Sequence, residues 1–166
     1  LVDRVSHGGG LLLSLCPKAD GSISQEQKDV LSEIGAWVRI NGEAIYGTRI
    51  WKIQSEGEIE KLIKDGVHPT WVFDACDGSD IRFTKKGNSL FVIILGPIKG
   101  ESITIESLSE DTKISTRGIK DISLLGSDEK ISWKRTDQGL ILNAPSENPS
   151  EYALSFKIEI KGDWID

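Results

Sequence analysis

Few residues in this chain could serve as nucleophiles or proton carriers, and they are scattered. The two histidines, His7 and His68, lie far apart, and neither stands in a nucleophile-like context with a Ser or Cys. His7 is better explained as a residue at the C-terminal end of a helix, where positive charge is favoured by the helix dipole. No pair of carboxylates can be assigned to acid/base chemistry either, because that assignment needs a known separation in space. The sequence therefore predicts no catalytic residue.

Metal binding has equally little support. Asp74, Asp77 and Asp80 surround a glycine, but an EF-hand loop needs acids at alternate positions and a closing Glu. A solvated turn before a strand is the preferred interpretation of these aspartates. Cys16 and Cys76 lack the CxxC or His-Cys spacing of a zinc site and are expected to be buried free thiols. We predict no metal-binding and no cofactor-binding residue.

The tryptophans are the remaining candidates for binding, because aromatic faces can stack on the apolar faces of sugars. Trp51, Trp71, Trp133 and Trp164 could contribute to such a platform. Trp133 lies among alternating strand residues, which favours a place in the core, and Trp164 follows the last predicted strand. Taken singly, each tryptophan is therefore predicted to have a structural role.

Composition excludes two classes of partner. The 166 residues carry 26 acidic against 20 basic side chains, a net charge of −6, which disfavours nucleic-acid binding. No uninterrupted apolar run reaches the roughly 18 residues of a membrane span. Two cysteines cannot build a disulfide framework, so the fold must depend on an apolar core.

The elements that would position these residues begin with a helix end and a strand. Residues 1–7 predict a helical turn with Leu1, Val2 and Val5 on one side. The turn ends at Gly8-Gly9-Gly10, since glycine readily adopts the positive φ found just past a helix. Leu11–Leu15 is apolar on both faces, which is typical of a strand in a covered parallel sheet.

The clearest helix follows this strand. Ser24 and Gln27 have the spacing of a capping box, in which each side chain serves the other's free backbone donor. An apolar stripe then runs to the helix end at Asn41-Gly42 and comprises Val30, Leu31, Ile34, Trp37 and Val38. Together these residues predict the closing βα unit of a parallel sheet or barrel.

The βα unit cannot stand alone, because both faces of its strand would meet water. The chain also has no Met and opens at Leu1 with what looks like the tail of a helix. We therefore expect this region to pack on the rest of the chain, or to be the severed edge of a larger structure.

Residues after about His68 predict an all-β domain. Short strands are separated by Gly, Asn and Asp, and in the last strand Leu154, Phe156, Ile158 and Ile160 alternate with polar residues. That period of two predicts one face in the core and one in water. The predicted fold class is mainly β: an antiparallel β-sandwich (68–166), preceded by a linker (52–67) and a βα remnant of a (β/α)8-like barrel (1–51).

Several motifs resemble α-L-fucosidases, family 29 of the glycoside hydrolases. The opening residues, the glycine turn and the strand are similar to the end of that family's catalytic barrel, and Asn41–Arg49 closely resembles the barrel exit. Weaker similarity to the family's C-terminal sandwich occurs in Asp80–Thr84, Leu95-Gly96-Pro97 and Leu124–Ser127. The resemblance covers nearly the whole chain.

Three residues depart from the family pattern near the predicted barrel strand. The family usually has Asn in place of Ser14, Gly in place of Cys16 and often Asn in place of Gly10. Active sites of such barrels lie at the C-terminal ends of the strands, so the rim or the substrate preference is expected to differ.

The resemblance implies an enzyme whose catalytic groups are not in this chain. The family hydrolyses terminal α-L-fucosides with retention, using an Asp nucleophile and a second acid, and both come from barrel segments before Leu1. The chain alone is expected to be inactive, with the sandwich buttressing the barrel. Its expected partners are the rest of the barrel and, for the parent enzyme, a fucosylated glycan. The family's localisation is mostly periplasmic, secreted or lysosomal.

Two other functions remain open from the residues alone. A free-standing carbohydrate-binding or interaction module would explain the tryptophans and the β-rich part, and a shorter natural gene product is a further possibility. An exposed stripe of Val30, Ile34, Trp37 and Val38 would also favour self-association.

Overall fold

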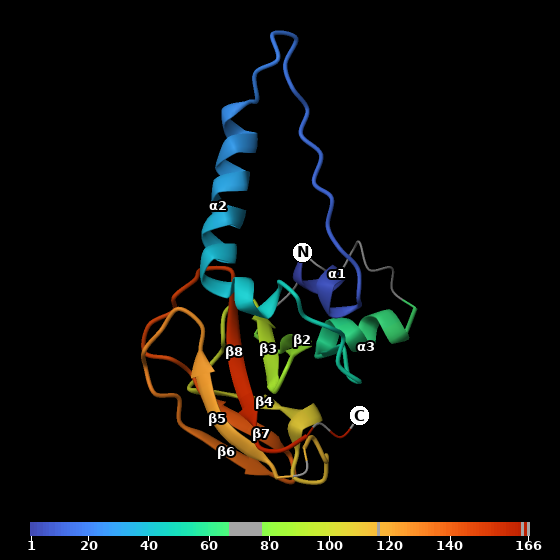
Figure 1. Cartoon of the computed structure of the whole chain (residues 1–166), viewed down its shortest axis with the longest axis vertical. Helices are drawn as coiled ribbons and strands as arrows, with labels where there is room; N and C mark the ends of the chain where they lie inside the picture. The colour runs from blue at the N-terminus through green and yellow to red at the C-terminus, as the bar shows by residue number, and fades with distance from the viewer. Residues whose placement is uncertain (67–77, 116, 164, 166) are drawn as a thin grey trace.

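The computed structural model describes residues 1–66, 78–115, 117–163 and 165. His68, Trp71, Asp74, Cys76, Asp77 and Trp164 lie outside these residues, so the predictions made for them are not tested. A body of two β-sheets carries a long hairpin, made of an extended arm and a helix, that projects away from it (Figure 1).

The body is an antiparallel sandwich, as the sequence predicted. The larger sheet has the strand order β1-β2-β3-β8-β5, with bounds Ser55–Glu56, Asp80–Lys86, Ser89–Leu95, Ala153–Ile160 and Ile119–Leu124. The smaller sheet has the order β4-β7-β6, with bounds Ser102–Ile105, Gly139–Asn143 and Trp133–Thr136. Every named pair is antiparallel.

The main core lies between the two sheets and is built from the inward residues of both. Phe83, Val92 and Phe156 of the larger sheet and Leu140 and Leu142 of the smaller one are completely buried. Trp51 belongs to the same core, with its ring centroid 5.1 Å from that of Phe83. The apolar face that the alternation predicts for each strand is thus buried, because each sheet covers the apolar face of the other.

The prediction of one wet face for the last strand was wrong for the first half of β8. Ser155 is completely buried although it points away from the main core. A second, smaller cluster covers that face and contains Trp37, Phe91, Ile93 and Ala153. The period of two identified the two faces correctly, but a helix from elsewhere in the chain covers the second one.

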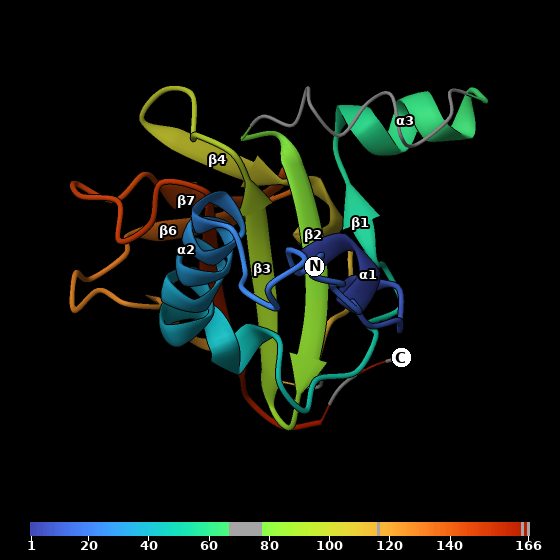
Figure 2. The same ribbon diagram turned by 90° about the horizontal axis from the view of Figure 1, so that it is seen from above.

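That helix is α2 (Gln25–Asn41), which continues into the short η1 (Gly42–Ala44). Its C-terminal half lies over the larger sheet, whereas its N-terminal half extends beyond it (Figures 1 and 2). Trp37 is 8% exposed and its Nε1–H donates to the Ala153 carbonyl at 2.9 Å. Gly126, with φ +81°, approaches the helix so closely that a Cβ there would overlap Ile40 Cγ2.

Two shorter helices lie beside the edge strand β1 and its neighbour β2 (Figure 2). α1 (Val2–Ser6) ends at His7, and Gly8 follows with φ +82°, as the glycine run predicted. α3 (Glu58–Lys64) follows β1 directly. No helix in the described residues has the length and apolar character needed to cross a membrane.

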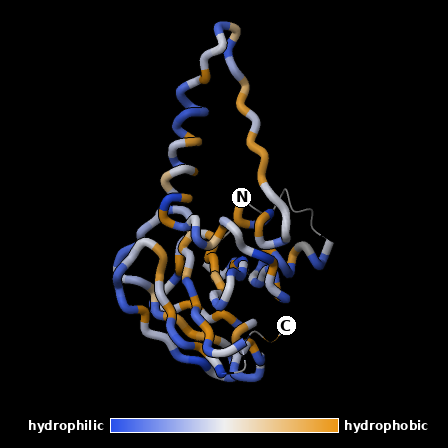
Figure 3. The backbone as a smooth tube through the Cα atoms, viewed as in Figure 1, coloured by the Kyte–Doolittle hydropathy of each residue, from blue (hydrophilic) through white to orange (hydrophobic). Residues whose placement is uncertain are grey.

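The strand predicted for Leu11–Leu15 does not form. These residues have no regular secondary structure and lie in the projecting arm (Figure 3). Leu12 is 92% exposed. A strand needs backbone partners on a neighbouring strand, and none of the described strands lies beside the arm. α2 forms in the same hairpin because a helix satisfies its backbone within its own segment.

Candidate functional site

Ser6, His7 and Asp3 come together at α1 but do not have the geometry of a catalytic triad. His7 Nδ1 lies 3.1 Å from Ser6 Oγ and 3.8 Å from Asp3 Oδ1, so one ring nitrogen faces both groups. A triad needs the serine and the carboxylate on opposite ring nitrogens. Ser6 is also completely buried and donates its hydroxyl proton to the Asp3 carbonyl at 2.9 Å. The prediction that His7 is a residue at a helix end is confirmed.

Asp3 instead holds α1 to the sandwich through a buried arginine. Arg82 of β2 is 1% exposed, and its Nε–H donates to Asp3 Oδ1 at 2.9 Å. Its Nη1 also donates to the Ile81 carbonyl. A buried charge is tolerated only when it is paired, so this contact ties α1 to β2.

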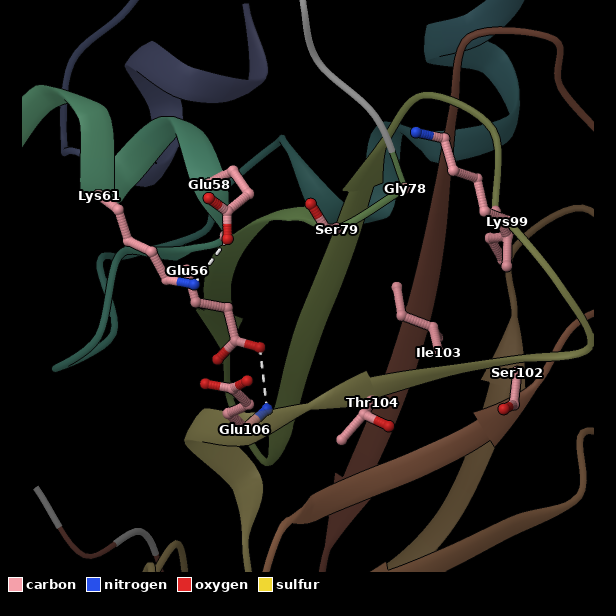
Figure 4. Close-up of a pocket in the computed structure, with 12 residues that line it drawn as sticks. Glu56, Glu58, Lys61, Gly78, Ser79, Lys99, Ser102, Ile103, Thr104 and Glu106 are labelled. Carbon is pink, nitrogen blue, oxygen red and sulfur yellow. Dashed lines mark hydrogen bonds and ion pairs between the residues drawn. The ribbon is translucent and has the colours of Figure 1, made fainter. Parts of the chain in front are cut away.

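A polar cavity of about 270 Å³ lies where β1, α3, β4 and η4 (Glu106–Leu108) meet. Glu56 reaches from β1 toward η4, where Oε1 accepts from the Glu106 N–H at 2.9 Å and Oε2 from the Ser107 N–H at 2.8 Å (Figure 4). Burial raises the pKa of Glu56, against the lowering effect of these donors. The carboxylate therefore caps η4 and links the two sheets.

Two further charged groups of this cavity, Glu58 and Lys61, pair with each other. Lys61 Nζ lies 2.7 Å from Glu58 Oε1 in an exposed ion pair on α3 (Figure 4). Asp80, which follows the lining residue Ser79, is buried, and its Oδ1 accepts from the Ile59 N–H at 2.9 Å. The prediction that Asp80 lies in a solvated turn was wrong, because Asp80 begins β2 and its side chain caps the N-terminal end of α3. No free acid/base pair is assembled among the described lining residues.

Metal binding finds no support in the described part of the chain, where no group of three His, Cys, Asp or Glu side chains could hold an ion. Cys16 is a free thiol, but the prediction that it is buried was wrong. The sequence pattern predicts a covered strand ending near Cys16, and that strand does not form. The backbone of Cys16 is nevertheless bound by the Gln27 side chain at both its N–H and its carbonyl.

The described tryptophans do not form a shared stacking platform. Trp51 is buried in the core, which agrees with the structural role predicted for it. Trp133 was expected to fill the core but is 39% exposed. It pairs with the buried Leu142 across the sheet, yet β6 is an edge strand, so one side of the indole meets solvent.

The most distinctive surface is apolar and lies on the hairpin. Between α1, α2 and the ends of β3 and β8 there is an apolar cleft of about 360 Å³, lined in part by Leu1, Val30 and Ile34. A second apolar groove lies between the arm and α2, beside Leu13, Leu15 and Leu31. The stripe on α2 is therefore divided: Trp37 is covered by the sandwich, whereas Val30 is 51% exposed.

Sequence reasoning missed two charged residues, the buried Arg82 and the partly buried Glu56. Arg82 occupies the alternate face of a strand, where the pattern predicts solvent. Glu56 lies in a polar segment whose composition predicts a linker. No local signal identifies either residue, because each partner is remote in sequence.

Comparison with known proteins identifies two matching family models. Residues 1–43 match the model described as α-L-fucosidase, and residues 76–159, just over half of the chain, match the α-L-fucosidase C-terminal domain. Human tissue α-L-fucosidase is 30% identical over 162 residues, and the α-L-fucosidase of Dictyostelium discoideum is 29% identical over 152. The matched regions cover 97% and 92% of this chain but 29% of each relative.

Solved structures give the same result. A Thermotoga maritima α-fucosidase in complex with a mechanism-based inhibitor matches 96% of this chain and 32% of its own, with a TM-score of 0.70 and 33% identity. Isoenzyme 1 from Paenibacillus thiaminolyticus, at 24% identity and a TM-score of 0.68, shows the same fold. The chain belongs to the α-L-fucosidase family, glycoside hydrolase family 29, and corresponds to its C-terminal part.

Proposed function

We propose that this chain forms the β-sandwich and the closing edge of the catalytic barrel in an enzyme that hydrolyses terminal α-L-fucosides with retention. One observation carries the proposal. A hairpin that matches the α-L-fucosidase model leaves its leucines and the outer half of the α2 stripe exposed in the described part of the chain. Apolar faces of this kind mark surfaces that another structure covers.

The arm would become the last barrel strand when neighbouring strands are present. Leu11–Leu15 already has an extended course (Figure 3), and four of its five residues are leucine. A parallel neighbour would supply the missing backbone partners, and flanking helices would bury both faces. α2 would then cover the outside of the barrel with its exposed residues while its base stays on the sandwich.

The catalytic carboxyl groups are proposed to lie in the part of the relatives that this chain does not span. Retaining glycosidases need a nucleophilic carboxylate and a second carboxyl group that first protonates the leaving oxygen and then activates water. Three acids that bind buried or partly buried groups, Asp3, Glu56 and Asp80, are each held by structural partners. The 166-residue chain alone is therefore proposed to be inactive.

The sandwich is proposed to buttress the barrel through fixed contacts at the base of the hairpin. Lys157 of β8 pairs with Glu43 at 2.7 Å, and Thr84 of β2 donates to the Ala44 carbonyl at 2.7 Å. Arg49 and Lys85 exchange two backbone hydrogen bonds at 2.8 and 2.9 Å. These contacts join the segment that resembles the barrel exit directly to the larger sheet.

The experiment that tests this proposal begins with the gene. The reading frame before the codon of Leu1 is expected to encode the rest of a barrel, and we call its complete product the extended protein. The extended protein should release 4-nitrophenol from 4-nitrophenyl α-L-fucoside, and the 166-residue chain should not. Turnover by the 166-residue chain, or no turnover by the extended protein, would contradict the proposal.

The exposed face should also make the isolated chain self-associate. Sedimentation velocity at increasing concentration is expected to show dimers or larger species, and Leu12→Asp combined with Val30→Asp should shift the chain toward monomer. A wild-type chain that stays monomeric at high concentration would argue against this.

A carbohydrate-binding module remains a second candidate because Trp133 exposes part of its indole. Titration calorimetry with fucose and fucosylated oligosaccharides tests it, using Trp133→Ala as the matched variant. Binding that disappears in Trp133→Ala would favour this function, whereas the absence of any heat of binding would remove it.

A further inference from the structure

The tip of the hairpin is held in a defined turn, although it lies far from the two sheets (Figure 1). Inside the turn, the Lys18 N–H donates to the Ser22 carbonyl at 2.8 Å, and the Gly21 N–H donates to the Lys18 carbonyl at 2.9 Å. Asp20 Oδ1 accepts from the Ser22 N–H at 2.9 Å and from its hydroxyl at 2.6 Å. The loop between the arm and α2 is thus closed on itself.

Gln27 attaches this loop to the first turn of α2. Its Oε1 accepts from the Cys16 N–H at 3.0 Å, and its Nε2 donates to the Cys16 carbonyl at 3.2 Å. A primary amide carries one acceptor and one donor side by side, so it can bind both backbone groups of one residue as a neighbouring strand does.

This contact replaces half of the capping box. Ser24 Oγ accepts from the Gln27 N–H at 3.4 Å, as the spacing predicts, but the Gln27 side chain binds Cys16 and not the Ser24 N–H. The reciprocal contact would stabilise only the helix end. The observed contact instead fixes where the arm ends relative to α2.

From this geometry we propose that Gln27 is a positioning residue that sets the rim of the fucoside site by holding Cys16 and the loop at residues 17–24. The inference rests on the proposed function, in which Leu11–Leu15 is a barrel strand. The C-terminal end of such a strand and the loop after it lie on the face of the barrel that binds substrate. Cys16 comes immediately before that loop, and Gln27 holds both of its backbone groups.

The expected kinetic effect is on substrate binding. Gln27 touches no reacting group, so its loss should loosen the rim without removing a group that acts only in the transition state. In the extended protein, Gln27→Ala should raise KM for 4-nitrophenyl α-L-fucoside by roughly threefold to tenfold, while kcat stays within about twofold. Gln25→Ala is the matched control, because Gln25 lies in the same helical turn but donates to Asp29 Oδ1.

Hydrogen exchange in the 166-residue chain measures the contact without any activity. Loss of one hydrogen bond should raise exchange of the Cys16 amide about fivefold in Gln27→Ala and leave it unchanged in Gln25→Ala. Gln27→Glu keeps the acceptor and loses the donor, so its KM and exchange rate should lie between those of the wild type and Gln27→Ala.

The possible results separate the two proposals. An active extended protein in which Gln27→Ala and Gln25→Ala have the same KM would overturn the role of Gln27 alone. Unchanged Cys16 exchange in Gln27→Ala would overturn it as well. An inactive extended protein would overturn the proposed function, and the role of Gln27 would fall with it.

Discussion

The sandwich and the hairpin are rich in the same type of apolar residue, leucine, but differ in how far they bury it. Leu90 and Leu140 in the sandwich are completely buried, whereas Leu12 in the arm is 92% exposed. The difference lies in the neighbours that each segment requires. Each sandwich sheet has its partner sheet within the chain, but the arm has no neighbouring strand in the described residues. An apolar pattern thus determines what a segment can bury, and the available neighbours determine whether it does.

The largest expected effect on stability comes from removing one large side chain from the sandwich, and the same kind of change in the hairpin is the comparison. Phe156→Ala should lower the free energy of unfolding by about 3–5 kcal/mol, because it leaves a cavity between the sheets. Leu12→Ala should change it by less than about 0.5 kcal/mol. Urea denaturation of the 166-residue chain at low concentration measures both. A large loss for Leu12→Ala would show that the arm is packed and would break the comparison.

The next effect concerns the ion pair that joins α1 to the sandwich. Asp3→Ala leaves the buried Arg82 guanidinium without its carboxylate and should cost about 2 kcal/mol, at the low end for buried pairs because Asp3 is partly exposed. Glu58→Ala removes an exposed ion pair with Lys61 and should leave the urea midpoint unchanged. Equal effects of the two variants would contradict the structural role of Arg82.

A smaller effect is expected where α2 meets the sandwich. Trp37→Phe keeps most of the aromatic packing but removes the donor to the Ala153 carbonyl, at a cost of about 1 kcal/mol. Trp133→Phe, at the exposed edge of the smaller sheet, should cost less. The two urea midpoints give the comparison, and the reverse order would mean that the base of α2 is not anchored by Trp37.

The smallest effect is a dependence on pH. Because burial raises the folded-state pKa of Glu56 above its ordinary 4.5, the folded protein binds more protons than the unfolded one between the two pKa values. Stability therefore falls as pH rises through that window, and Glu56→Gln should remove this slope.

Glu159 provides the control of opposite sign for that slope. Its hydrogen bond to Lys120 lowers its pKa, so its contribution is present above the ordinary 4.5 and is lost as pH falls through the folded value. Urea midpoints between about pH 3.5 and 7 measure both slopes. A Glu56→Gln curve parallel to the wild type would show that burial does not disfavour the carboxylate.

Local patterns were sufficient for the elements that satisfy themselves or find a partner sheet. The Ser24 cap, the apolar stripe and Asn41-Gly42 predicted α2 with nearly its observed bounds, because helical hydrogen bonds are local. The alternation in β8 identified its core face. The same reasoning failed for Leu11–Leu15, because a strand depends on a partner that no local pattern reports.

Errors at single residues had the same cause. Periodicity assigned Trp133 to a face but could not show that β6 is an edge strand. Asp80 looked like a turn residue because the helix that it caps lies on another segment. Most of the candidate site was not predictable for this reason: Glu56 and Arg82 are defined by contacts between elements, whereas the Gln27 spacing was visible but its partner was not.

The close approach of Gly126 to Ile40 has a mechanical consequence. α2 has 17 residues, so its far end lies about 25 Å from its base, and a tilt of about 5° at the base would move the tip by about 2 Å. A side chain at Gly126 would push on Ile40 at the base of α2 and so tilt the helix. The turn after β5 thus helps to set the direction of the hairpin, and a small shift there would move the tip of the hairpin by a larger distance.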